Sequence, residues 1–143
     1  MPVVQMALIY NRMFAYRPAF AIVGESVDGG YVSNEFPMFT PKDTEYDDDV
    51  LLSYLVHFLD SPASLAEIDA ESQGSTKTSR NRLVQETFLC MKVNIPTDPK
   101  RMAEIVSVLD SADRLRDELK KIGDGAQVVR NAFGGVLVPA ATG

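Results

Sequence analysis

The sequence is poor in the residues that build disulfide frameworks and most metal sites. It contains one cysteine, one histidine and no tryptophan among 143 residues. A single cysteine excludes an intrachain disulfide, and a zinc site needs several Cys and His residues at set spacings, which this chain does not have. We therefore expect a protein of a reducing compartment that holds no metal and no cofactor.

Long apolar runs are also missing. A membrane-spanning helix needs about 20 consecutive apolar residues, and the apolar N-terminal segment is interrupted by Asn11, Arg12, Arg17 and Pro18. That segment also lacks the preceding basic stretch that is typical of secretory signals. We expect a protein that is neither transmembrane nor exported by a signal peptide, with the cytoplasm as its location.

Length and composition are typical of a folded protein. A chain of 143 residues with 45% hydrophobic content predicts one globular domain, residues 1–143. The net charge of -6 is unevenly distributed, because residues 41–72 carry nine acids and one lysine whereas residues 73–143 carry eleven Lys/Arg and eight Asp/Glu. Acidity of the whole chain argues against indiscriminate binding of polyanions, but it allows a basic face on the C-terminal half.

The N-terminal third has the composition of strands and turns. Residues 3–10 and 19–24 are rich in β-branched and aromatic side chains, and the breaks between them predict a hairpin or a pair of neighbouring strands. A turn at Asp28-Gly29-Gly30 predicts a third short strand at 31–33. Residues 36–46, which contain two prolines, are predicted to be a loop.

Two helices are predicted in the middle of the chain. Three aspartates at 47–49 precede the apolar run 50–59, and negative charge at this end stabilises a helix. Ser61-Pro62 is typical of an N-cap followed by proline at the first helical position, and Ser64 with Glu67 fits a capping box, so either start predicts a second helix to about Glu71. Residues 72–82 are polar, contain no acid and are predicted to be a mobile loop.

The C-terminal half is predicted to contain a long strand and then helix. Apolar and polar residues alternate over residues 83–95, which predicts a half-buried strand that Pro96 ends. Apolar residues then recur at spacings of three and four from Pro99 to Gly123, as one helix or as two with a joint near Asp110-Ser111. Residues 125–143 are predicted to be an arm or a last strand. The fold class is therefore α+β, an antiparallel sheet packed against C-terminal helices.

The only histidine raises the question of catalysis. Ser53, His57 and Asp60 project from one side of the predicted helix at 100° per residue. Acyl transfer would also need backbone donors for an oxyanion, but a serine in mid-helix has neighbouring N–H groups already used by the helix. The favoured interpretation is a polar stripe on an otherwise buried helix. The alternative is a cytosolic ligand-binding domain or enzyme that uses His57 as acid, base or pH sensor.

Charged segments suggest two further interactions. Lys77, Arg80 and Arg82 lie in the acid-free loop and are candidates for contact with an anion or RNA phosphate. The acids at 43–49 lack the glycine and closing glutamate of a calcium loop. They are interpreted as the solvated start of a helix, or alternatively as the site where an acidic regulatory protein would bind a basic partner.

Residues 88–96, FLCMKVNIP, and 97–109, TDPKRMAEIVSVL, resemble the last strand and first helix of the coat proteins of single-stranded RNA bacteriophages. The similar part covers about residues 80–125. The resemblance implies an N-terminal hairpin, helices that lie across a partner's sheet in a tight dimer, and a shell of many dimers in a virion. It also implies contact of one sheet face with RNA, for which Lys92 and Asn94 are the candidate side chains.

The function predicted first is that of a non-enzymatic, self-assembling structural protein, specifically a coat or shell subunit with RNA as a further partner. Besides the resemblance, this prediction depends on an excess of apolar helix surface, since one small sheet would not cover both the 50–59 helix and the 99–122 helix. The expected interface lies on the second of these helices: Met102, Ile105, Val106, Leu109, Leu115 and Leu119.

Overall fold

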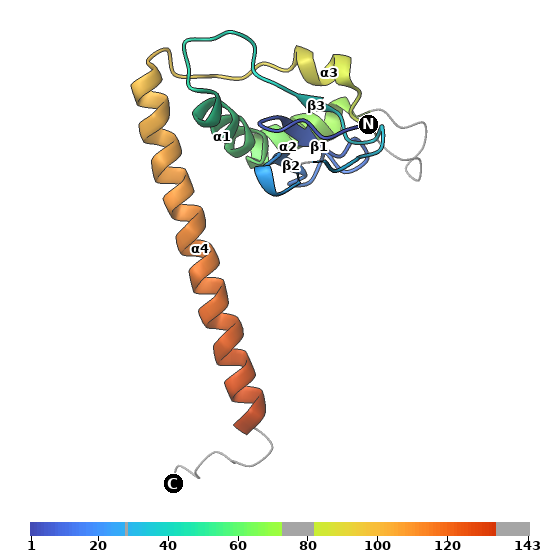
Figure 1. Ribbon diagram of the computed structural model, residues 1–143. Helices are drawn as coiled ribbons and strands as arrows, with labels where there is room; N and C mark the ends of the chain where they lie inside the picture. Colours follow the sequence, from blue (N-terminus) through green and yellow to red (C-terminus); the bar gives the residue numbers. More distant parts are fainter. Residues whose placement is uncertain (28, 73–81, 134–143) are drawn as a thin grey trace. The chain divides into compact units, whose positions relative to one another are not determined.

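The computed structural model describes residues 1–27, 29–72 and 82–133 (Figure 1), with the helical backbone alone for residues 126–133. The chain divides into two compact units, Met1–Val106 and Ser107–Gly143. The predicted mixture of helices and an antiparallel sheet is confirmed. The basic loop residues Lys77 and Arg80, and the segment 135–139, lie outside the described residues.

A small antiparallel sheet with the strand order β2-β1-β3 forms the N-terminal part. The predicted pair of neighbouring strands is confirmed, since β1 (Leu8–Tyr10) pairs with β2 (Phe20–Ile22) and places Tyr10 opposite Phe20. A short 3-10 helix, η1 (Glu25–Val27), follows.

The third strand lies where a loop was predicted. It is β3 (Met38–Phe39), whereas the predicted strand at 31–33 makes only an isolated bridge, between Tyr31 and Pro2. The two prolines of the segment suggested a loop, because proline has no N–H to donate to a sheet. At Pro37 the hydrogen bond to the sheet instead runs to its carbonyl oxygen, which accepts from the N–H of Tyr10 at 3.4 Å.

Both helices predicted in the middle of the chain are confirmed, and of the two starts considered for the second, the structure has the one at Ser61. Helix α1 (Asp48–Leu59) starts at Asp47, whose side chain accepts from the N–H groups of Asp49 and Val50. Helix α2 (Pro62–Glu71) starts at Ser61, whose hydroxyl accepts from the N–H of Ser64 at 3.3 Å. Each cap satisfies N–H groups that have no partner inside the helix.

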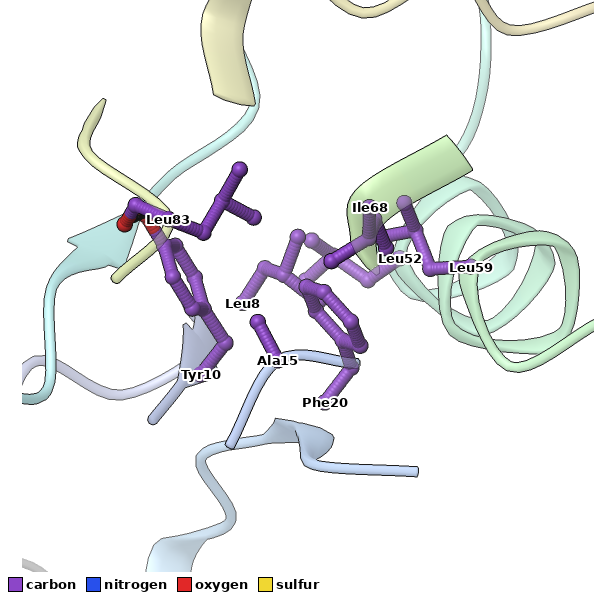
Figure 2. Packing of buried hydrophobic residues seen from close by; sticks show 8 residues of the cluster. All are labelled: Leu8, Tyr10, Ala15, Phe20, Leu52, Leu59, Ile68 and Leu83. Atoms are coloured by element: carbon purple, nitrogen blue, oxygen red, sulfur yellow. Dashed lines mark hydrogen bonds between the residues drawn. The ribbon is translucent and has the colours of Figure 1, made fainter. Parts of the chain in front are cut away.

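The main core lies between the sheet, α1 and α2. Its buried side chains are Leu8, Tyr10, Ala15, Phe20, Leu52, Leu59, Ile68 and Leu83. Figure 2 shows Leu83 beside Tyr10, with Leu52, Leu59 and Ile68 grouped at the helices. A second cluster forms around Leu51, Met102 and Val106 on the other side of α1.

The predicted long strand at 83–95 is wrong. The segment contains a short helix, α3 (Gln85–Cys90), and residues 91–96 are irregular. The reason is Phe88, whose ring lies 4.9 Å from that of Tyr10 and 5.0 Å from that of Phe39. A strand would have placed Phe88 on the same face as Glu86 and Lys92, opposite to that of the buried Leu83. The helix α3, which begins two residues after Leu83, instead brings the ring of Phe88 to those of Tyr10 and Phe39.

The C-terminal helix is longer than predicted. Helix α4 (Pro99–Phe133) is continuous, without a joint at Asp110-Ser111, and it passes through Gly123 and Gly125. Its first turn is capped by Asp98, whose side chain accepts from the N–H of Lys100 at 3.0 Å. The predicted end at Gly123 is wrong because neither glycine adopts the positive φ of a helix C-cap. Each glycine only weakens the helix, by about 1 kcal/mol relative to alanine.

Leu83 and Leu89 distinguish the helix from the predicted strand, since a strand would bury both side chains on one face. Leu83 is 0% exposed and Leu89 is 66% exposed. Replacement of Leu83 by alanine should therefore lower the free energy of unfolding by about 2 to 5 kcal/mol, while Leu89→Ala should change it by less than about 0.5 kcal/mol. Urea denaturation measures both, and similar losses in the two variants would contradict the helix.

Candidate functional site

The polar stripe on α1 does not stand out as a catalytic centre. Ser53 and His57 on α1 and Asp60 at its C-cap are half-buried, and each interacts with other groups of the chain. The N–H of Asp60 is used by the helix end, where it donates to the carbonyl of Val56 at 3.0 Å. These three residues thus lie beside Leu51, Leu52 and Leu59, the side chains that α1 buries in the core.

The apolar side chains of α1 are covered by the chain itself. Leu52, Val56 and Leu59 belong to the main core with the sheet and α2, while Leu51 and Leu55 contact the cluster of Met102 and Val106 at the start of α4. Most of the apolar surface of this helix, which was expected to be in excess, therefore packs inside the unit Met1–Val106.

A buried tyrosine connects the core to a group of charged side chains. Tyr10 is 1% exposed, and its hydroxyl donates to the carbonyl of Leu83 at 3.0 Å. Burial raises the pKa of Tyr10 to about 12; the nearby Arg12 opposes this effect and Glu86 adds to it. The arrangement keeps the phenol protonated, so it acts as a hydrogen-bond donor.

Arg82, one of the candidate RNA-binding residues, is engaged within the chain. Its guanidinium lies 2.9 Å from the carboxylate of Glu35. The backbone supports the same junction, since the N–H of Arg12 donates to the carbonyl of Glu35 at 2.9 Å and the N–H of Leu83 donates to that of Arg12 at 3.1 Å. Arg82 therefore joins the segment that precedes α3 to the segment that precedes β3.

Lys92 and Asn94, the other described candidates for RNA contact, do not share the face of a strand. Both are exposed, in the irregular segment after α3. Two tyrosines near or on α1 hold this segment: Tyr54 donates to the carbonyl of Asn94 at 2.7 Å, and Tyr46 donates to that of Pro96 at 2.5 Å. Sequence reasoning missed these two contacts, because they join residues 40 and 50 positions apart.

The acidic segment forms a helix start and an open hollow. Asp47, Asp48 and Asp49 line the hollow together with Met6, which has a positive φ of 54°. In residues 1–27, 29–72 and the described part after residue 82, no group of His, Cys, Asp and Glu side chains is placed to hold a metal ion. Cys90, at the end of α3, is exposed.

The predicted interface residues of α4 separate into two groups. Met102 and Val106 are buried within the unit Met1–Val106, and Ile105 and Leu109 are half-buried. Leu115 and Leu119 are 61% and 59% exposed, and they are joined by two apolar residues that were not predicted as interface, Val108 at 69% and Ile122 at 67%. Exposure of large apolar side chains along one helix is the clearest candidate for an interaction surface in the described residues.

A second apolar surface lies on the N-terminal part of the chain. A hollow there is lined mainly by aliphatic side chains from the sheet and the segments beside it: Val3, Ile9, Ile22, Val23, Val27 and Val32. Ile22 is 37% exposed and Val27 is 47% exposed. The sequence suggested strands here, but it did not indicate that an apolar face would remain open.

No family model, no curated protein and no solved structure matches this chain. Within residues 1–27, 29–72 and 82–133, none of the helices combines the length and apolarity that crossing a membrane requires.

The buried tyrosine predicts a loss of stability at alkaline pH. Because the pKa of Tyr10 is raised to about 12, from about 10 in an unfolded chain, its contribution is complete below pH 10 and is lost as the pH rises toward 12. The loss is of the order of 2 kcal/mol. Denaturation from pH 9 to 11.5 should show a shallower decline for Tyr10→Phe than for the wild type.

Tyr31→Phe is the matched control, since Tyr31 is 79% exposed. This variant should keep the decline of the wild type. Equal declines in Tyr10→Phe and in the wild type would show that Tyr10 does not carry the effect.

Proposed function

We propose that this protein is a non-enzymatic structural subunit that associates with further copies of itself. The observation that carries the proposal is the exposure of Val108, Leu115, Leu119 and Ile122, each more than half accessible, on α4. Burying a fully exposed side chain of this kind is favourable by about 1.5 to 3 kcal/mol, and these four side chains are more than half exposed. Four on one helix provide a large part of what a stable interface needs.

The interface is narrower than the one expected from the sequence. Met102 and Val106 already fill the second core cluster with Leu51, so they stabilise the subunit itself. The residues available to another copy begin after Val106, where the described side chains up to residue 125 are exposed or half-buried.

A closed shell is the more specific form of the proposal. The coat-protein resemblance depended on a long strand at 83–95, and α3 occupies that place, so the support now comes from exposed surfaces instead. A shell needs at least two different contacts per subunit, because a single closed two-fold contact ends at a dimer. The aliphatic hollow that includes Ile9 and Val27 is available as the second contact.

RNA contact receives less support from the described residues. Arg82 is paired with Glu35, and Lys92 is a single exposed cation in its irregular segment. A net charge of -6 also repels a polyanion unless basic side chains gather on one face.

Self-association is tested by sedimentation velocity from 0.5 to 50 µM, taken as roughly the range in which specific interfaces of this kind assemble. The expected species has at least twice the chain mass of 15.7 kDa. A monomer at every concentration would refute the proposal. Electron microscopy of the same samples distinguishes closed particles, which a shell subunit should form, from dimers.

A further inference from the structure

The exposed apolar residues of α4 belong to a regular repeat. Apolar positions alternate at steps of three and four along the helix: Ile105, Val108, Ala112, Leu115, Leu119 and Ile122. The sequence continues the same steps at Ala126, Val129 and Phe133. An average spacing of 3.5 residues is the heptad repeat of a left-handed coiled coil, in which these residues occupy the a and d positions and meet a second helix.

Charged residues of α4 follow the same seven-residue period on another side of the helix. Asp110, Asp117 and Asp124 are seven residues apart, and Arg114 and Lys121 lie four residues after the first two. In the heptad that the apolar repeat defines, these are the f and c positions, which point away from a partner helix. Pairing through the apolar seam would therefore leave these charges in water.

The side chains of the seam complement one another in size when α4 pairs with α4 of a second copy of this chain. If two α4 helices run antiparallel, Ala112 lies opposite Leu115 of the second copy, and Val108 lies opposite its Leu119. Both of these layers then combine a smaller with a larger side chain. In a parallel pair Ala112 would meet its own counterpart and leave an underfilled layer, which costs stability.

The residues that flank the seam also accept this pairing. The antiparallel arrangement places Leu109 beside Arg116 of the second copy and Ser111 beside its Glu118, so no like charges meet. Arg116 and Glu118 already have partners on their own helix, Asp113 at 3.1 Å and Lys121 at 3.4 Å.

We infer that α4 forms an antiparallel two-stranded coiled coil with α4 of a second copy, through Val108, Ala112, Leu115 and Leu119. This inference rests on the proposed function and specifies its first contact. The pair is a closed two-fold contact, which leaves the aliphatic hollow of each chain available to other copies.

Disulfide trapping tests the pairing and its direction. In a Cys90→Ser background, Val108→Cys and Leu119→Cys would face each other across the antiparallel pair. Two copies of either variant alone would place their cysteines about 16 Å apart along the axis, from a rise of 1.5 Å per residue, which is too far for a disulfide. After the two variants are mixed, diluted and reconcentrated, mass spectrometry should show the mixed disulfide and neither homodimeric one.

Asp117→Cys in the same background is the matched control, since the f position faces water, and it should not crosslink. Homodimeric disulfides in the separate Val108→Cys and Leu119→Cys samples would overturn the antiparallel pairing in favour of a parallel one. Absence of any seam disulfide in an associated protein would overturn the coiled coil.

A pair of double variants separates the coiled coil from self-association in general. Leu115→Gln with Leu119→Gln removes four apolar side chains from each pair of helices and should raise the dimer dissociation constant by more than about 100-fold. Arg114→Gln with Lys121→Gln introduces the same two glutamines outside the seam and should change the dimer dissociation constant by less than about threefold.

The outcomes of this comparison are distinct. If the Leu115/Leu119 variant associates as strongly as the wild type, the coiled coil is overturned, while the proposed function would hold through another surface. A wild type that is monomeric at 50 µM, a concentration within roughly the usual range of assembly, would refute both.

Discussion

The packing of α1 between two apolar clusters is the constraint on which the rest of the unit Met1–Val106 depends. One side of the helix contributes Leu52 and Leu59 to the core that the sheet and α2 share, and another contributes Leu51 to the cluster with Met102 and Val106. Tyr54 on this helix donates to the carbonyl of Asn94, and Tyr46, just before the helix, donates to that of Pro96, so both also hold the segment that leads into α4. A helix used on two sides leaves only a narrow polar margin, and that margin is where the single histidine lies.

Burial along α4 changes at Val106. Up to this residue the helix is part of a core inside one chain, and beyond it the described side chains are half-buried or exposed although the apolar repeat continues. Apolar residues that stay exposed in a regular helical period are typical of a surface that another helix covers. The same helix thus stabilises the subunit with its beginning and offers an interface with its continuation.

The hydrogen bond of Tyr10 shows how a small sheet can position a distant segment. Its ring lies among Phe20, Phe39 and Phe88, and its hydroxyl reaches the carbonyl of Leu83. A buried carbonyl without a partner would cost about 1 to 3 kcal/mol, so the phenol stabilises the turn into α3. Arg82 and Glu35 complete this junction at its more exposed side.

Local signals in the sequence were sufficient for the elements whose ends are chemically marked. Asp47 and Ser61 start helices because their side chains satisfy free N–H groups, and this chemistry is complete within four residues. The start of α4, where the side chain of Asp98 accepts from the N–H of Lys100, has the same local chemistry. The heptad period of α4 is likewise visible in the sequence, although which of its apolar residues are covered is not.

Only the tertiary structure decided the elements that depend on distant partners. Residues 83–95 alternate as a strand would, but α3 forms because Phe88 gains three aromatic neighbours from segments 49 to 78 positions earlier, at Tyr10, Phe20 and Phe39. In the same way, β3 pairs with β1 although Pro37 precedes it, and Arg82 forms an ion pair with Glu35 rather than with an external anion. Periodicity in the sequence indicates which side of a segment is apolar, but which other segment covers that side depends on how the whole chain packs.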